Sequence, residues 1–540
     1  MRDRAAAWVP PLEIRRVYAL PAWSADVLPY AGIFVAALVL RVVDLQNRPL
    51  HHDESSHAWL SWLFLTGKGY HYDPAFHGPL QFYVGALMYL LAGVGDTAMR
   101  LGPALVGAAI TFLPFFLRRQ LGSVATLAAS AILCISPSYL YYSRFSREDI
   151  YFAFLTLAFV VVLLRFLDEP QRWHPSAMLA LLAASFATKE TTYITAFVVV
   201  TFVAATVVWQ LLQGRRVGQP AAAAPVVRTL RSVGWDAWIS GVASFAFIYT
   251  LLFTTFLFRP EGLRSGIYDG LRYWLSQQPV NRGGQPWFYY LFLLPLYELP
   301  VLVLAVIGVV VSLRRPTLLR LFLVWDAALS LVVYSWASER MPWLGLHVLL
   351  PLVLLAGIGA HTVWAARGRP ARVSVLAGAA LGAVVLGYGA VQVVYVHPAD
   401  PAEPLVFTQT SEQFAPIRDR LDLLIRRVRA GGRQPTIYVD DWGGTGWPWN
   451  WYLRDSLVRY GDMSTGLPIR ADAVIVDDLN RGRVQAALRG YRGERFHLRE
   501  WWVIDYGSIS PGTLWRWYLH REPWSPQGYV DQWLYVPARG

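Results

Sequence analysis

Long apolar runs constrain the fold of this 540-residue chain more than any other feature. A helix needs about 20 apolar residues to cross a bilayer core, so each run of that length predicts a membrane-spanning helix. Only 16% of the residues are charged, which excludes a soluble globular protein and a disordered one. The runs that reach or approach this length are residues 28–45, 101–117, 122–142, 150–167, 175–188, 192–212, 237–258, 287–311, 318–336, 343–364 and 373–396. The sequence therefore predicts an α-helical polytopic membrane protein with about 11 transmembrane helices.

A shorter apolar segment, residues 79–94, decides the topology. Arginines cluster in the short loops between the long runs, and such loops tend to be cytoplasmic. They share the side of the N-terminus only if 79–94 does not cross, so we expect an interfacial or re-entrant helix there. This topology predicts a cytoplasmic tail over 1–27 and a transmembrane domain over 28–396. It also predicts a first external loop over 46–100 with interfacial helices. The net charge of +12 then reflects topology in a cell membrane, and no nucleic-acid partner is expected.

Residues 397–540 differ in composition from the rest of the chain. Short strand-like pieces at 436–440 and 473–477 alternate with helical candidates at 411–429 and 481–489. Such alternation is typical of an α/β domain. We therefore expect a small C-terminal α/β domain, which the topology above places on the extracytoplasmic side. A dinucleotide site is not expected, because no G-x-G-x-x-G follows a strand.

Two adjacent carboxylates, Asp53 and Glu54, follow the first apolar run closely. Acids at the mouth of a membrane span are costly unless they are solvated or used. A carboxylate beside a substrate hydroxyl can take its proton, which is the work of a general base. The alternative is a solvated acidic loop. The same loop also holds His71, Asp73 and His77, which favours the functional interpretation.

Metal binding is the rival use of this loop, since histidine and carboxylate side chains are common ligands. His52 with His57, or His71 with His77, offers such side chains. Neither pair has the i, i+4 spacing of a familiar zinc motif, so a tightly bound transition metal is less favoured. The single cysteine, Cys134, excludes disulfides and cysteine-based metal sites.

Three further charged stretches fall on the predicted outer face: residues 143–149, the hairpin tip Lys189–Glu190, and Ser338–Glu339–Arg340. A planar guanidinium offers paired donors to a phosphate. The basic side chains in these stretches are therefore candidate phosphate ligands, with internal salt bridges or lipid-headgroup contacts as alternatives. Convergence of polar stretches from distant parts of the sequence on one face is the strongest functional signal in this chain.

Isolated acids at membrane depth and a group of tryptophans are weaker signals. Glu298 and Asp326 lie within apolar runs, where acids are functional hypotheses by default. Glu298, flanked by prolines, alternatively satisfies backbone groups of a broken helix. Aromatic side chains can stack on sugar rings, but packing at the membrane interface is commoner. Four tryptophans are closely spaced in the C-terminal region: Trp442, Trp447, Trp449 and Trp451.

Taken in order, these motifs resemble those of the GT-C integral-membrane glycosyltransferases, over roughly residues 28–365. The acidic pair Asp53–Glu54 is followed by His77–Gly78–Pro79–Leu80 and then by the stretch from Ser143 to Asp149. Within that superfamily the chain is similar to the dolichyl-phosphate-mannose protein mannosyltransferase-like group. Two pieces suggest its prokaryotic "flippase activity-associated" branch, namely 339–344 (ERMPWL) and 447–454 (WPWNWYLR).

The resemblance implies an inverting glycosyltransferase that uses a polyprenyl-phosphate-linked sugar donor on the extracytoplasmic side. It implies Asp53 as the catalytic base with Glu54 beside it. The acceptor, which is a protein, glycan or lipid, or a divalent cation would be positioned by Glu148, Asp149, His52 and His77. The donor phosphate would be bound by Arg144, Arg147, Lys189 and Arg340. No cofactor is required for this chemistry, and a divalent cation remains an open alternative.

Two other functions are compatible with parts of the sequence. A transporter or flippase for lipid-linked sugars would also need phosphate-binding arginines, but it should place charges near the bilayer midplane and often shows an inverted repeat. A membrane scaffold would tolerate replacement of its external acids. The gathering of charges at one face favours the enzyme.

Overall fold

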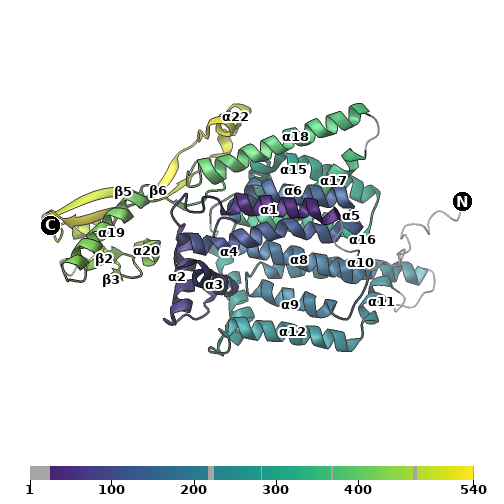
Figure 1. Ribbon diagram of the computed structural model, residues 1–540, viewed down its shortest axis with the longest axis horizontal. Coiled ribbons are helices and arrows are strands. Elements are labelled where there is room, and N and C mark those ends of the chain that lie inside the picture. The colour runs from purple at the N-terminus through teal and green to yellow at the C-terminus, as the bar shows by residue number, and fades with distance from the viewer. Residues whose placement is uncertain (1–24, 217–223, 281–282, 366–368, 466–470, 539–540) are drawn as a thin grey trace.

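The computed structural model describes residues 25–216, 224–280, 283–365, 369–465 and 471–538. The predicted cytoplasmic tail over 1–27 lies almost entirely outside these residues. A bundle of long helices forms the larger part of the molecule, and a region with a β-sheet lies at one end of the bundle (Figure 1).

Eight helices among the described residues are long and apolar enough to span a membrane. They are α4 with its continuation (Asp96–Leu121), α8 (Glu148–Asp168), α10 (Thr192–Arg216), α12 (Trp235–Phe253), α15 (Tyr289–Arg314), α16 (Leu318–Trp336), α17 with the turn before it (Pro342–Trp364), and α18 (Arg369–Val391) with the turn after it, to Val396. Four apolar helices are shorter: α1 (Leu28–Val42), α3 (Leu80–Ala92), α6 (Ser123–Ile135) and α9 (His174–Phe186). Each of the eleven predicted runs thus corresponds to a helix, and α3 coincides with the segment 79–94.

The predicted first external loop begins with helix α2 (His52–Thr66), which runs across the bundle direction at the end near the sheet, beside α3 (Figure 1). A capping box starts α2: the His51 ring accepts from the backbone N–H of Asp53, and the Glu54 carboxylate accepts from that of His51. These bonds satisfy backbone donors that have no partner within the helix. Gly67, in the left-handed conformation, ends α2.

The continuous helix expected over 122–142 is wrong in one respect, because the chain breaks between α6 and α7 (Pro137–Tyr142). Pro137 has no backbone N–H and cannot continue the hydrogen-bond ladder of α6. Ser136 instead caps α7 by accepting from the backbone N–H of Tyr139.

Two buried charges satisfy the ends created by this break. The Arg41 guanidinium donates to the carbonyls of Leu133 (2.9 Å) and Cys134 (3.3 Å) at the end of α6. The Glu298 carboxylate accepts from the backbone N–H of Ser138 (3.0 Å) at the start of α7. A cation at a helix C-terminus and an anion at a helix N-terminus both oppose the helix dipole favourably. The structure therefore supports the second interpretation of Glu298, satisfaction of a broken helix.

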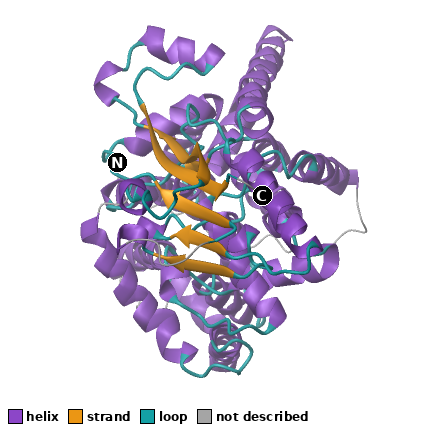
Figure 2. Ribbon diagram, turned by 90° about the vertical axis from the view of Figure 1, so that its left-hand side faces the viewer, coloured by secondary structure: helices purple, strands orange, loops and turns teal. Residues whose placement is uncertain are grey.

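The C-terminal region contains one mixed six-stranded sheet, with strand order β1-β5-β6-β4-β2-β3 (Figure 2). Strands β3, β2 and β4 are parallel, and β4, β6, β5 and β1 pair antiparallel. The strands are β1 (Gln409–Thr410), β2 (Ile437–Asp440), β3 (Val458–Gly461), β4 (Ala473–Asp477), β5 (Tyr491–Trp502) and β6 (Gln527–Pro537). The two predicted strands are β2 and β4, and the first predicted helix is α19 (Phe414–Ala430). The second helix is shorter than expected, since α21 covers only Arg481–Val484.

The chain just before α2 is bonded directly to the C-terminal region. The Thr410 hydroxyl donates to the carbonyl of Leu50 (2.7 Å), and the backbone N–H of Leu50 donates to the Tyr452 hydroxyl (3.1 Å). The His51 ring lies 2.9 Å from the carbonyl of Phe407. The sheet region therefore fixes the start of α2.

The tryptophans of the C-terminal region mostly serve packing. Trp449 and Trp451, on the short helix α20 (Trp449–Tyr452), are completely buried. The Trp451 ring N–H donates to Asp96 at the start of α4 (2.8 Å). Trp442 is 41% exposed, so its ring is available for stacking on a sugar ring. The rings of Trp449 and Trp451 are not.

Candidate active site

The expected convergence of charged stretches is observed around Asp53. Its side chain, on the first turn of α2, is 27% exposed and forms an ion pair with Arg147. Burial by itself would raise the pKa of Asp53, but the Arg147 guanidinium and the nearby His52 hold that pKa well below its usual range. Asp53 is therefore ionised, and its guanidinium partner makes it a weak base in this state.

Arg147 lies at the start of α8 among several carboxylates. Besides Asp53, its Nε atom lies 3.3 Å from Asp149 and 3.7 Å from Glu148. The guanidinium also stacks over the Trp343 ring, 4.0 Å from its centroid. Because acids in the first turn of a helix are stabilised by the helix dipole, α8 favours the ionised state of Glu148 and Asp149. The local sequence R-E-D thus places one cation between acids of two helices.

The two acids of α8 have different partners. Asp149 Oδ1 accepts from Lys189 Nζ (2.7 Å) and lies 3.1 Å from His347 Nε2 on α17. Glu148 lies 3.0 Å from His57 Nε2 of α2. Both carboxylates are almost completely buried. The hairpin Lys189–Glu190 and the stretch 143–149 therefore meet, as the sequence predicted.

His77 joins the same cluster because of the glycine that follows it. A Cβ atom on Gly78 would lie 2.2 Å from the Ala187 carbonyl, so only glycine permits this approach. The backbone N–H of Gly78 donates to the Thr188 carbonyl (3.1 Å). This contact brings His77 Nδ1 within 2.7 Å of Glu190. Burial opposes protonation of His77, but Glu190 outweighs it and raises the pKa of the imidazole.

A small pocket opens beside His77 and Lys189. Its other lining residues include Glu190, Trp274, Gln278, Tyr334 and Glu339. Trp274 belongs to α14 (Gly270–Gln277), within the loop 259–286 that is rich in Gly, Arg and Gln. The pocket thus combines charged groups of the cluster with aromatic and amide side chains.

Glu54 faces away from this pocket and is completely buried. Arg100 contacts it with two nitrogens (2.8 and 2.7 Å), and Arg48 with one (2.9 Å). The backbone N–H groups of His51 and Ser146 also donate to it. Burial would raise the pKa of Glu54, but Arg100 and Arg48 hold it well below the usual range. All its acceptor positions serve the protein, so it does not contact an acceptor or a metal ion here.

Arg144 is also placed differently from the expectation. Its guanidinium donates to four carbonyls at the end of α1, those of Leu40 (3.3 Å), Arg41 (3.1 Å), Val43 and Asp44 (2.5 Å). The last carbonyls of a helix have no partner within it, and a guanidinium matches several of them at once. The expected phosphate contact of Arg144 is therefore corrected to a cap on α1.

Arg340 has a similar but less complete role. It donates to the carbonyl of Ala337 (2.5 Å), just after α16, and to that of Gln285 (2.8 Å), before α15. It is partly exposed, and its neighbour Glu339 lines the pocket. Arg340 therefore lies near the predicted site without joining the Asp53 cluster directly.

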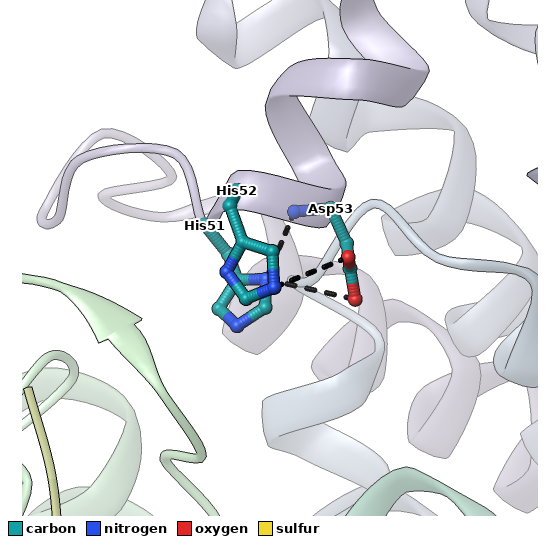
Figure 3. A group of neighbouring side chains, drawn as sticks. All are labelled: His51, His52 and Asp53. Atoms are coloured by element: carbon teal, nitrogen blue, oxygen red, sulfur yellow. Dashed lines mark hydrogen bonds and ion pairs between the residues drawn. The ribbon is translucent and has the colours of Figure 1, made fainter. Parts of the chain in front are cut away.

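Three neighbouring residues, His51, His52 and Asp53, present the type of ligand atoms that bind metals (Figure 3). However, the His51 ring donates from Nε2 to the Phe407 carbonyl and accepts at Nδ1 from the backbone N–H of Asp53. Burial lowers the pKa of His51 to about 4, which agrees with a neutral ring. This leaves His52 Nε2 and the Asp53 carboxylate, which already faces Arg147. Two ligands beside a guanidinium fit a divalent cation poorly.

Sequence reasoning missed three contributors to this site, Arg48, Arg100 and Arg499, and considered His57 only as a metal ligand. Arg499, on β5, donates to the carbonyls of Gly444 (2.8 Å) and Trp447 (2.9 Å). Burial lowers the pKa of Arg499 to about 10. The Asp53 carboxylate acts in the opposite direction, because it favours the charged guanidinium. No motif marks Arg100 or Arg499, because both are brought to this region by tertiary contacts. The position of Arg48 in the same loop as Glu54 is the only signal that could have suggested it.

Comparisons with known proteins agree with this architecture. Residues 76–225 match the family model described as dolichyl-phosphate-mannose-protein mannosyltransferase. No curated protein matches the chain at a significant level. The chain is similar in structure to ArnT from Cupriavidus metallidurans bound to undecaprenyl phosphate, with a TM-score of 0.63, 17% identity, and coverage of 93% of this chain and 98% of that one.

A second solved structure shares the fold. It is the oligosaccharyltransferase AglB from Archaeoglobus fulgidus in complex with an inhibitory peptide and a dolichol-phosphate. Its TM-score is 0.52 at 12% identity, with coverage of 93% of this chain and 74% of that one. The apo form of the Cupriavidus ArnT gives a TM-score of 0.59 at 16% identity. The chain therefore shares the fold of these solved structures, and eight of its described helices are long and apolar enough to span a membrane.

Proposed function

We propose that this protein is an inverting glycosyltransferase that moves a sugar from a polyprenyl-phosphate-linked donor to an acceptor hydroxyl, on the extracytoplasmic side of the membrane. The observation that carries the proposal is the partly exposed Asp53 carboxylate, held against Arg147 where α2, α8 and the Lys189–Glu190 hairpin meet. The structural relatives support the donor class, since one binds undecaprenyl phosphate and another dolichol-phosphate.

Asp53 acts as the general base in this scheme. The acceptor hydroxyl loses its proton to the Asp53 carboxylate as its oxygen bonds to the anomeric carbon. The bond between that carbon and the phosphate oxygen breaks, and the electron pair leaves with a polyprenyl phosphate monoester. Attack on the face opposite the leaving group inverts the anomeric configuration. Fixed cations stabilise the phosphate as its charge develops, and the scheme requires no metal ion.

Arg147 links donor binding to the strength of the base. Without donor, the guanidinium holds the Asp53 pKa low. A donor phosphate offers Arg147 a second anion and competes with Asp53 for it. As Arg147 turns to the phosphate, Asp53 loses its partner and becomes a stronger base. The base is thereby activated when the donor is present.

Lys189 and His77 complete the phosphate side of the proposed site. Both line the pocket, and the Arg147 guanidinium lies 3.5 Å from His77 Nε2. His77 carries positive charge more readily because of Glu190. Asp149 contacts Lys189, Glu190 contacts His77, and His347 in turn contacts Asp149. Glu339 also lines the pocket, next to Arg340 in the sequence. Glu54 and Arg144 shape the site and do not contact substrate.

The test is transfer of labelled sugar in proteoliposomes, with a panel of undecaprenyl-phosphate sugars that begins with mannose. The donor that supports transfer is then used to compare wild type with Asp53→Asn, which keeps the size of the side chain. We expect transfer to fall by about 10²–10⁴-fold. Arg420→Gln, an exposed site on α19 far along the sequence, is the matched control. Normal transfer by Asp53→Asn would exclude it as the base, and donor flipping without a glycosylated product would favour the transporter.

A further inference from the structure

The loop between β5 and β6 contains a ten-residue amphipathic helix, α22 (Pro511–His520). Ser510 and Thr513 form a capping box at its start, and Arg521 ends it in the left-handed conformation. One face of α22 is fixed to the protein. Trp517 is completely buried there, and its ring N–H donates to the Ala402 carbonyl (2.7 Å).

A second contact places α22 beside the membrane-spanning part of α18 (Figure 1). The Tyr388 hydroxyl donates to the carbonyls of Tyr518 (3.3 Å) and Leu519 (3.2 Å), and the rings of Tyr388 and Tyr518 lie 5.3 Å apart. The candidate span ends at Val396. Tyr388 therefore lies about 12 Å before that end, at 1.5 Å per residue. A helix packed on Tyr388 is level with the outer part of the span rather than beyond it.

Large apolar side chains are exposed on the opposite face of α22. Trp515 is 63% exposed and Leu519 is 41% exposed, four residues apart on one face. The stripe of α18 that contains Tyr388 continues with Leu381 and Val384, which are 65% and 66% exposed. The exposed face of α22 thus extends the apolar surface that α18 offers to lipid.

We propose that α22 is an interfacial helix that inserts Trp515 and Leu519 into the lipid leaflet on the side of the C-terminal region. Tryptophan is enriched at this depth of membrane proteins, because its ring is apolar and its N–H is polar. Arg516 and His520 lie one position further along the helix and suit the phospholipid headgroups. Through β5, this contact fixes the strand that carries Arg499 relative to the bilayer. The proposal does not depend on the enzymatic activity.

Depth measurements on the full chain in nanodiscs of phosphatidylethanolamine and phosphatidylglycerol test it. The 24 tryptophans rule out fluorescence quenching as a probe, so we choose spin labels on single cysteines in a Cys134→Ala background. Labels are placed by Trp515→Cys and Leu519→Cys. Leu376→Cys, exposed on α18, is the lipid-facing control, and Leu479→Cys, exposed after β4, is the control for water.

We expect the ratio of oxygen to nickel-chelate collision rates at 515 and 519 to be several-fold above that at 479 and close to that at 376. Ratios at 515 and 519 equal to that at 479 would overturn the proposal. So would strong dipolar coupling between labels at 515 in nanodiscs with two copies, since that would identify a second copy as the partner. Leu519→Cys keeps Trp515, so it tests the same face if the tryptophan variant does not fold.

Discussion

Asp53 and Glu54 are neighbours in the sequence, yet their environments are opposite. Glu54 is completely buried and accepts from two guanidinium groups and two backbone N–H groups. Asp53 is 27% exposed and depends on one guanidinium, that of Arg147. Successive residues on a helix point about 100° apart, so the first turn of α2 directs Glu54 toward Arg48 and Arg100 and directs Asp53 toward Arg147.

The difference in environment suits Glu54 to holding the structure together and Asp53 to accepting a proton. A carboxylate with every acceptor position filled holds its neighbours together but has nothing to offer a substrate. A carboxylate with one exchangeable partner can release that partner and take a proton. In the proposed scheme, Glu54 positions Asp53, because Glu54 ties α2 to Arg48, Arg100 and the backbone of Ser146.

The largest expected effect on stability is that of Glu54→Gln. This change leaves two buried guanidinium groups without a compensating charge, and breaking a buried pair costs about 3–5 kcal/mol. Asp53→Asn, as the matched control, should cost less than about 1 kcal/mol, as is usual for a partly exposed pair. Thermal unfolding in detergent measures both. Equal destabilisation by the two variants would contradict the division of roles.

A smaller effect is expected from His51, whose ring is buried and neutral. Its pKa is about 4 in the folded protein and about 6.5 when unfolded. The unfolded chain therefore binds more protons between these values, and stability falls by up to about 3 kcal/mol as the pH drops through this window. His51→Gln should make the melting temperature less sensitive to pH between 7 and 5. His71→Gln, at an exposed position, should not, and an unchanged slope in His51→Gln would disprove this account.

Arg147→Gln should change the pH dependence of sugar transfer without preventing folding. In wild type, the fall of kcat/KM for the donor at low pH reports the pKa of Asp53 in the free enzyme, which Arg147 lowers. The fall of kcat at low pH reports the pKa of Asp53 in the donor complex. The first fall should therefore lie at lower pH than the second. Without Arg147, the Asp53 pKa rises in the free enzyme and the two falls should coincide. Arg144→Gln, which alters only the cap on α1, should keep them apart.

The sequence was sufficient for the architecture and for the meeting of distant segments. Apolar runs located the helices of the bundle, and alternation of short elements located β2 and β4. The motif order predicted that Asp53, His77, Arg147 and Lys189 would lie together, and they do.

The partners of individual side chains could not be predicted. Arg144 and Arg147 are three residues apart in one motif, yet one caps α1 and the other faces Asp53. The distinction depends on the turn before α8, which has no periodic pattern. Arg100 reaches Glu54 from a different helix, 46 residues away, and no local rule connects such positions.

The bonds between Leu50 and the C-terminal region have a consequence for biosynthesis. Leu50 and Thr410 are 360 residues apart, so the segment that leads into α2 lacks these bonds until the last quarter of the chain is being made. A nascent chain that has made all its long helices still lacks these bonds to the start of α2. Under the proposed function, a chain terminated before Thr410 would therefore have the helices of the bundle but would not be expected to transfer sugar.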